Sequence, residues 1–545
     1  MGTRFVGLMS SGGYHRLAGA VALACLAVAF FGCAPAGSLE RSPLTERQLA
    51  TPSFGPPPAA PESGQVISQL RRDLDSSSGH SLLSQLVPTQ GAALWISLIV
   101  MLVVAVDFSR PFHPRNLEML ALLPIGFLLF EVMQFFELFE DPNYRLLMDW
   151  VFIAIMAVSL FLLGRALWRA GRPHADPWLP GLSSRALIAL TLILLTANLL
   201  AGLLRPPDDA GFYTNLGAQR LRERGMFPYG DPLLSGTPGA TYSPIFYLSH
   251  LAYQLLLVPA TLNTAEARPA FGVYLLPPDL ASRLATATFH VFGVAGLIIA
   301  ARRLVGRDAA WGVAALYCGS AYVMGVGSER ELIGGMTFVS HIAPAAVTML
   351  AFAALPHPLV SGALLATGAA TLFYPAFFIP AWVGYYSTSR PVLVRFVAGL
   401  AVATLLIGGP VLLRSQRIEG RGLISTVLHE TQGHQQDPNA YGSSPFGFWG
   451  QREGIRAVLR EPLIAGQPNT SPAFLAFAAF VLGAFFLARG RSELQLALLT
   501  GALGIGSQLW KIHATGVYVT WYLGFLLLGF LGHQLKPSVR TKRDG

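Results

Sequence analysis

Two adjacent carboxylates, Asp208 and Asp209, open a polar loop that runs from Pro206 to Pro244. They follow the apolar stretch 186–204 almost directly. An acidic pair at a membrane surface is costly to desolvate, so such residues usually bind or react with something there. A carboxylate in this position can act as a general base or can hold a cationic partner. A solvated loop start is the alternative that needs no chemistry.

The residues after the acidic pair indicate a short helix and then two turns. Tyr213 follows Asp209 by four residues, a spacing that places both side chains on one face of a helix. The stretch 215–224 is basic and has the composition of a helix. Turn signals follow at Tyr229, within Pro-Tyr-Gly-Asp, and at Tyr242, within Tyr-Ser-Pro.

Two further charged groups could complete a site. The turn 328–331 carries Glu329, Arg330 and Glu331. Its carboxylates could assist a base or hold a divalent ion, and Arg330 could bind a phosphate. Lys511 follows an apolar segment and could also bind a phosphate. The alternatives are a plain charged turn and a lysine that reaches toward the membrane surface.

Histidines form the remaining candidates. His341 lies one turn inside an apolar segment, where it either bonds within the helix bundle or faces a cavity. The loop 414–471 contains His429, His434 and Trp449. The two histidines are five residues apart, which is not the spacing of four that aligns two metal ligands on one helical face. We therefore expect no cofactor, with a divalent metal as the less favoured alternative.

The elements that must position these groups are membrane helices. The chain has 545 residues, of which 53% are hydrophobic and 12% charged, and a mean hydropathy of +0.50. This composition is typical of polytopic membrane proteins. We predict an all-α helical bundle with outer loops and interfacial helices, and with spans at 92–108, 117–138, 146–165, 186–204, 280–300, 309–326, 335–354, 359–373, 376–386, 392–413, 472–489, 494–510 and 514–533.

Two regions do not fit simple spans. The pieces 359–373 and 376–386 are short and meet at Tyr374-Pro375, so we predict one broken or re-entrant pair or two short spans. The segment 243–262 is apolar but is interrupted by prolines and polar residues. We predict that it lies on the outer face as an interfacial or re-entrant helix.

The distribution of charge supports placing 243–262 on the outer face without crossing. In that arrangement the predicted inside segments hold 19 basic and 6 acidic residues, and the outside segments hold 19 basic and 23 acidic residues. Together these are the 38 basic and 29 acidic residues of the chain. Crossing would move the cluster Arg302–Arg307 to the outside, against the positive-inside rule. The net charge of +9 thus encodes orientation, and no nucleic acid partner is expected. All the candidate residues above fall on the outer side.

The N-terminus has the features of an export signal. Residues 1–33 combine a basic start, an apolar run and Gly32-Cys33, so either a retained signal-anchor or a lipidated Cys33 is expected. An exported Pro/Ser-rich linker, 34–91, and additional transmembrane helices, 92–185, follow. The remainder comprises a helical domain, 186–535, with outer loops 205–279 and 414–471, and a basic tail, 536–545, inside with the N-terminus if the signal is retained.

The first outer loop resembles a known family. A span, an acidic residue, a tyrosine four later, a short helix, a Pro-Tyr turn and a Tyr-x-Pro helix start are similar to the first outer loop of GT-C superfold membrane glycosyltransferases, closest to glycosyltransferase family 87. The resemblance covers mainly 186–262 and more loosely 280–533. The chain departs from the family pattern in Ser243, where a proline is usual, in its additional N-terminal spans, and in lacking a lysine near Phe373-Tyr374.

The resemblance implies a function. Such enzymes transfer a sugar, for example mannose, from a polyprenyl-phosphate carrier to a lipid or glycan acceptor at the outer face of the bacterial cytoplasmic membrane, with inversion. By its spacing to Tyr213, Asp209 matches the family's general base, with Asp208 as its neighbour. Arg330 and Lys511 would then meet the donor phosphate. The remaining candidates would bind substrate: Tyr213, Tyr229, Tyr242, His341, His429, His434 and Trp449.

Other functions stay open at this point. A glycan ligase or polymerase would use a similar outer loop. A transporter, or a non-catalytic membrane scaffold, belongs to a different class of protein. A transporter is expected to show internal repeats and ionisable groups at mid-bilayer depth. No repeat is visible, and the polar groups gather on one side.

Overall fold

The structure is a computed structural model that describes residues 90–134, 142–172, 177–205, 207–231, 234, 238–256, 280–327, 332–333, 335–416, 418, 422–428, 430–431, 463, 471–510 and 518–533. The predicted signal 1–33, nearly all of the linker 34–91 and the basic tail 536–545 lie outside these residues.

The described chain is all-α apart from one two-residue β-ladder, which confirms the predicted fold class. Strands β1 (Val326–Gly327) and β2 (Leu332–Ile333) pair antiparallel, with Val326 opposite Ile333. The helices are α3 (Gln90–Val104), α4 (Pro114–Leu120), α5 (Pro124–Gln134), α6 (Pro142–Ala170), α7 (Ser184–Leu204), α8 (Asp209–Arg224), η4 (Pro238–Ala240), α9 (Pro244–Leu256), α10 (Leu280–Leu304), α11 (Ala309–Cys318), α12 (Ala321–Met324), α13 (Val339–Ala353), α14 (Pro358–Ala369), η6 (Tyr374–Phe378), α15 (Ile379–Tyr386), α16 (Arg390–Leu413), α17 (Leu423–Leu428), α21 (Pro472–Ala488), α22 (Glu493–Trp510) and α23 (Thr520–Leu531).

Four helices are long and apolar enough to cross a membrane. They are Trp150–Ala170 within α6, α7, α10 and α16. Large apolar side chains remain exposed on them, such as Leu405 of α16, which is 72% exposed. A protein in water rarely leaves so many large apolar groups uncovered, whereas a bilayer solvates them. These features support a multi-pass membrane protein.

Proline and glycine break two of the predicted spans. The segment 117–138 forms α4 and α5, separated by Ala121–Leu123, because Pro124 has no N–H to continue a helix. The segment 309–326 is interrupted at Gly319, the C-cap of α11, and Ser320 then caps α12.

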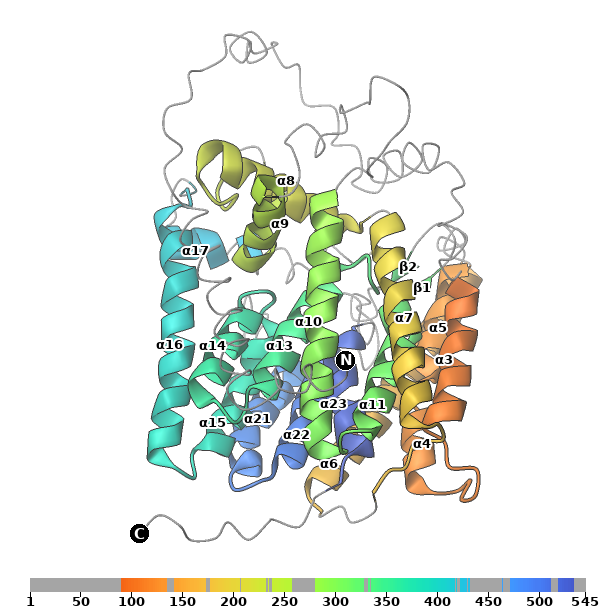
Figure 1. Cartoon of the computed structure of the whole chain (residues 1–545). Coiled ribbons are helices and arrows are strands. Elements are labelled where there is room, and N and C mark those ends of the chain that lie inside the picture. The colour runs from red at the N-terminus through yellow and green to blue at the C-terminus, as the bar shows by residue number, and fades with distance from the viewer. Residues whose placement is uncertain are drawn as a thin grey trace, which may run out of the picture.

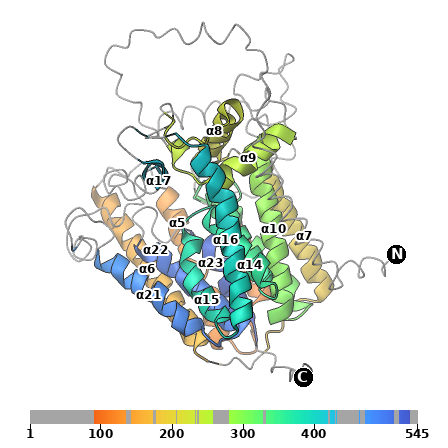
Figure 2. The ribbon, with the colours of Figure 1, turned by 90° about the vertical axis from the view of Figure 1, so that its left-hand side faces the viewer.

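The short pieces around Tyr374-Pro375 form a helical hairpin, an arrangement that fits either a re-entrant pair or two short spans. α14 and α15 are joined through η6, and the two ends of this hairpin meet at the same depth. The Tyr386 hydroxyl, at the end of α15, donates to the carbonyl of Leu355, just before α14, over 2.8 Å. α16 packs tightly on α14, because Gly362 and Gly399 bring each backbone within contact of the other helix; a Cβ at Gly362 would lie 2.1 Å from the Phe396 carbonyl oxygen. Figure 2 shows α14, α15 and α16 together.

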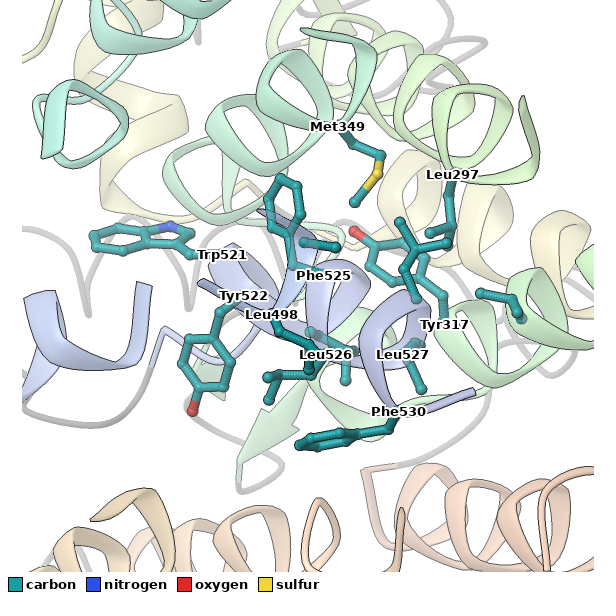
Figure 3. Close-up of a cluster of buried hydrophobic side chains, with 14 of the residues drawn as sticks. Leu297, Tyr317, Met349, Leu498, Trp521, Tyr522, Phe525, Leu526, Leu527 and Phe530 are labelled. Carbon is teal, nitrogen blue, oxygen red and sulfur yellow. The ribbon is translucent and has the colours of Figure 1, made fainter. Parts of the chain in front are cut away.

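The bundle has one large buried core that connects the N-terminal helices with the rest. Part of it surrounds α23, where Phe525 lies among Leu297 of α10, Tyr317 of α11 and Met349 of α13 (Figure 3). Trp521 stacks on Tyr374 of η6 at 3.9 Å between ring centroids. This stack fixes the broken helix against α23 below the candidate site.

The two ends of the bundle differ in content. α8, α9 and α17 lie together at one end, which we call the α8 end (Figure 1). The connections from α10 to α11, from α15 to α16 and from α21 to α22 lie at the opposite end, which we call the basic end (Figures 1 and 2). The segment 243–262 thus forms α9 beside α8 over its described part, and α17, from the second predicted outer loop, lies at the same end.

Candidate functional site

The acidic pair lies where α7, α8, α10 and α13 come together. Asp208 is the N-cap of α8, and its Oδ1 accepts from the Gly211 N–H at 2.8 Å. The Asp208 N–H donates to the Thr337 carbonyl at 3.2 Å, just before α13. A Cβ at Gly211 would lie 2.7 Å from the Ser282 hydroxyl of α10. Glycine here lets the start of α8 sit directly on α10, while the Gly211 N–H holds the Asp208 carboxylate and the Thr337 carbonyl holds its backbone.

Asp209 is the first residue of α8, which runs without a break to Arg224. The helix therefore begins earlier than the predicted 215–224, and Asp209 and Tyr213 lie one turn apart within it, as their spacing predicts. The N-terminus of a helix carries a partial positive charge that stabilises a carboxylate in the ionised form. An ionised carboxylate is the form that can accept a proton. Gly225, with φ of 66°, ends the helix in the left-handed conformation.

Two arginines near the acidic pair were not singled out from the sequence. Arg205 follows α7, and its Nη1 donates to the Met324 carbonyl at 3.1 Å. Arg283, in the first turn of α10, is buried and its Nη1 donates to the Leu203 carbonyl at 2.9 Å. Carbonyls at a helix C-terminus stabilise a cation. In the sequence, each arginine stands at the end of a span, where basic residues usually serve to orient the chain in the membrane. Only the fold shows that both lie beside the start of α8.

The tyrosines divide into two groups. Tyr229 is fully buried, its hydroxyl donates to the Tyr242 carbonyl at 2.7 Å, and its ring meets Tyr247 edge-on at 5.9 Å. Burial, and to a lesser extent Tyr247, raises the pKa of Tyr229 far above its usual range. Its hydroxyl therefore fastens the turn before α9. Tyr213 and Tyr242 are only half-buried.

A polar seam joins α8 to α9. Thr214 Oγ1 lies 3.2 Å from His250 Nε2, and Gln254 Nε2 donates to Asn215 Oδ1 at 2.8 Å. Thr214 and Asn215 are neighbours in α8, and His250 and Gln254 are one turn apart in α9, so this part of α8 packs directly on α9. His250 is fully buried, which lowers its pKa to about 4, although the hydrogen bond to the Phe246 carbonyl opposes this shift. The seam makes α8 and α9 one layer above the bundle.

His341 lies in the first turn of α13, close in sequence to Thr337, the partner of Asp208. It is buried, and its ring lies 5.0 Å from Phe338 and 4.4 Å from Tyr518 between centroids. Tyr518 in turn stacks on Trp521 of α23 at 4.2 Å. His341 therefore belongs to the α8 end of the bundle. It begins an aromatic row that continues through Tyr518 and Trp521 to Tyr374 of η6.

The two predicted outer loops pack against each other. The Phe227 N–H donates to the Arg414 carbonyl at 2.6 Å, and the Gln416 N–H donates to the Tyr229 carbonyl at 3.1 Å. Glu430 is buried and acts electrostatically on Tyr247, whose pKa it helps to raise after burial, the larger cause. This carboxylate neighbours the predicted His429 and is the part of that motif that the structure describes.

Several predicted residues lie outside the described residues: Glu329, Arg330, Glu331, His429, His434, Trp449 and Lys511, together with the side chain of Asp209. The β1–β2 ladder brackets residues 328–331, so that turn connects two paired strands. Lys511 falls between Trp510 and Tyr518, which are both described. Among the described residues, no three histidine, cysteine or carboxylate side chains are grouped to hold a metal ion.

Comparison of the chain with protein-family models, with curated proteins and with solved structures finds no match. The resemblance to glycosyltransferase family 87 therefore rests on the residues of the first outer loop and remains a prediction. What is established is an all-helical chain with four helices suited to a membrane.

Proposed function

We propose that the chain is a membrane glycosyltransferase that moves a sugar from a polyprenyl-phosphate carrier to a hydroxyl acceptor. One observation carries the proposal: an acidic pair at the start of α8 lies beside two arginines, Arg205 and Arg283, at the end of a membrane bundle. A transfer of this kind needs a base for the acceptor and a cation for the leaving phosphate in one place.

In the proposed step, Asp209 takes the proton of the acceptor hydroxyl as the acceptor oxygen attacks the anomeric carbon. The bond from that carbon to the phosphate oxygen breaks on the opposite face, so the configuration inverts. The lipid phosphate leaves with the electron pair of that bond. Arg205 and Arg283, together with the predicted Arg330 and Lys511, would stabilise its growing negative charge.

Asp208 has a different role in this proposal. Its Oδ1 is already engaged with the Gly211 N–H, and its own N–H is engaged with Thr337. It would therefore position the start of α8, and with it Asp209. Tyr213, Tyr242 and His341 lie on the elements around the acidic pair and would contact the sugar or the acceptor.

The test compares three Asp→Asn variants in membranes supplied with labelled polyprenyl-phosphate sugars. Asp209→Asn should lower transfer by roughly 100-fold or more, the usual contribution of a general base. Asp208→Asn should lose less, because asparagine also caps helices. Asp231→Asn, whose carboxylate lies 3.8–3.9 Å from Arg220 and Arg224, is the matched control. Full transfer by Asp209→Asn would refute the assignment of the base.

One observation favours the transporter alternative. His290 lies in the middle of α10 and is buried, and within the described part of the chain neither of its ring nitrogens has a hydrogen-bond partner. An ionisable group inside a membrane helix often marks a transport path. If the wild-type chain transfers no sugar from any donor, while His290→Phe abolishes uptake of a solute, the transporter reading replaces the enzyme.

A further inference from the structure

An arginine and tryptophan surface lies at the basic end of α6, far along the chain from the acidic pair. It comprises Arg165 and Trp168, which share one side of the helix end by their spacing of three residues, and Arg172, which lies two residues beyond the helix. The Arg172 guanidinium stacks on the Trp168 ring at 3.6 Å. Trp168 is 52% exposed and the Arg165 side chain is 27% exposed, so both can be reached from outside the bundle.

The charges beneath this surface do not balance. Arg165 Nε and Nη2 and Arg169 Nε all approach one oxygen of Glu118, at 3.0, 2.5 and 2.9 Å. Two guanidinium groups around one carboxylate leave one excess positive charge. Arg169 is tied inward, since its Nη1 donates to the Phe530 carbonyl at 2.8 Å. Arg165 is the member of the cluster that reaches the surface.

An apolar row along α6 leads to the same place. Ile153, Leu160 and Phe161 are 42%, 53% and 37% exposed. Gly164 has open space around it, because no atom lies within 4 Å of a Cβ built there. An exposed apolar row that ends in arginine and tryptophan has the chemistry of a lipid, with acyl chains along the row and a phosphate at its end.

We infer that Arg165, Trp168 and Arg172 bind the phosphate of an anionic phospholipid in the leaflet at the basic end. A soluble anion would gain nothing from the apolar row, and a zwitterionic lipid would not neutralise the excess charge. The site also has a rigid base, since Gln495 Nε2 of α22 donates to the Ala170 carbonyl at 2.8 Å. A lipid bound here therefore stabilises the junction of α6 with α22 and α23.

The experiment uses the full chain reconstituted in phosphatidylcholine vesicles with or without phosphatidylglycerol. Phosphatidylglycerol should raise the midpoint of thermal unfolding of the wild-type protein. The variant R165Q/R172Q should lose at least half of that rise. R390Q is the matched control, because it removes one exposed arginine from α16 at the same end of the bundle, and it should keep the full rise. An equal rise in all three proteins would overturn the inference.

Two further measurements separate lipid binding from a structural role of the arginines. Glu118→Gln adds one positive charge to the cluster, so it should retain more phosphatidylglycerol in native mass spectrometry even if the protein unfolds more easily. Unchanged or reduced retention would contradict the site. Inorganic phosphate should not raise the midpoint, and an equal rise with phosphate would overturn the assignment to a lipid.

If R165Q/R172Q does not fold, wild-type protein and a photoactivatable phosphatidylglycerol replace it. Cross-links should fall within residues 150–172. Cross-links found only elsewhere would overturn the inference.

Discussion

Three arginines at the basic end, Arg165, Arg169 and Arg303, are paired with carboxylates and join helices to one another, whereas two arginines near the start of α8, Arg205 and Arg283, donate to backbone carbonyls. Arg303 contacts Glu493 at 2.9 Å and donates to the last two carbonyls of α13, and Arg165 and Arg169 share Glu118. Arg205 and Arg283 instead donate to the carbonyls of Met324 and Leu203.

The difference shows how one residue type serves two purposes. A guanidinium paired with a carboxylate has its charge compensated and acts as a fastener. One that donates to carbonyls is fixed in place by the backbone. Asp208 is fixed similarly, through backbone groups at the start of α8. The start of α8 thus combines fixed geometry with nearby cationic groups, which is what a reactive site needs.

The largest expected effect concerns the arginine–carboxylate pairs that join helices. Glu118→Ala removes a fully buried carboxylate and leaves two arginines without it, so the free energy of unfolding should fall by about 3–5 kcal/mol. Glu493→Ala, in a pair whose side chains are each 27% exposed, should cost about 1 kcal/mol or less. Chemical unfolding in detergent measures both. Equal losses of unfolding free energy would contradict the expected difference between a buried and a partly exposed arginine–carboxylate pair.

The next effect concerns the α8 end and pH. His250 has a pKa of about 4 in the folded chain and about 6.5 when unfolded, so the unfolded state binds a proton first as pH falls. Stability should be unaffected above pH 6.5 and should decline by about 3 kcal/mol in total as pH falls from 6.5 to 4. His250→Gln should remove this part of the slope. A variant with the wild-type slope would show that the seam between α8 and α9 is not the source.

A smaller effect tests the turn before α9. Tyr229→Phe removes the hydroxyl that satisfies the Tyr242 carbonyl, so unfolding should become easier by about 1–2 kcal/mol. Tyr247→Phe, which removes the bond to the Gly239 carbonyl, should cost a similar amount. Both losses should appear in thermal unfolding. If Tyr229→Phe instead lost sugar transfer while keeping the stability of the wild type, the Tyr229 hydroxyl would be assigned to substrate binding.

The smallest effect is expected at an exposed pair. Arg110 contacts Asp107 at 2.9 Å at the surface, and the Ser109 hydroxyl, followed by Arg110, lowers the pKa of Asp107 to about 2. Because solvent screens this pair, Arg110→Gln should leave the unfolding midpoint unchanged at neutral pH. A clear loss would mean that exposed arginines fasten the bundle as buried ones do.

Much of the fold was predictable because membrane helices are read from long apolar runs. The segments that became α6, α7, α10 and α16 satisfy the length that a bilayer demands. The break at Tyr374-Pro375 was also predictable, because proline interrupts a helix and the two apolar pieces on either side of it are short. The predicted single span 117–138 was too simple. A backbone break before Pro124, inside an apolar run, ends α4 and is followed by α5.

The candidate site was predictable only in part. The acidic pair, the spacing to Tyr213 and the helix that follows them are local features, and the structure has that helix. Arg283 was missed because 78 residues separate it from Arg205 and its type suggests only a span end. Tyr229 looked available in the sequence, but its hydroxyl is occupied by a carbonyl 13 residues away.

The sequence by itself determined the class of protein, the spans, and the segregation of basic connections from polar loops, because hydropathy and charge act on each segment independently of its neighbours. Only the tertiary structure decided which polar groups meet. It placed Asp208 beside Thr337, Arg283 beside Leu203, and Arg165 beside Glu118. These contacts depend on how separate helices pack, and packing is set by the shapes of whole surfaces rather than by the order of residues within any one of them.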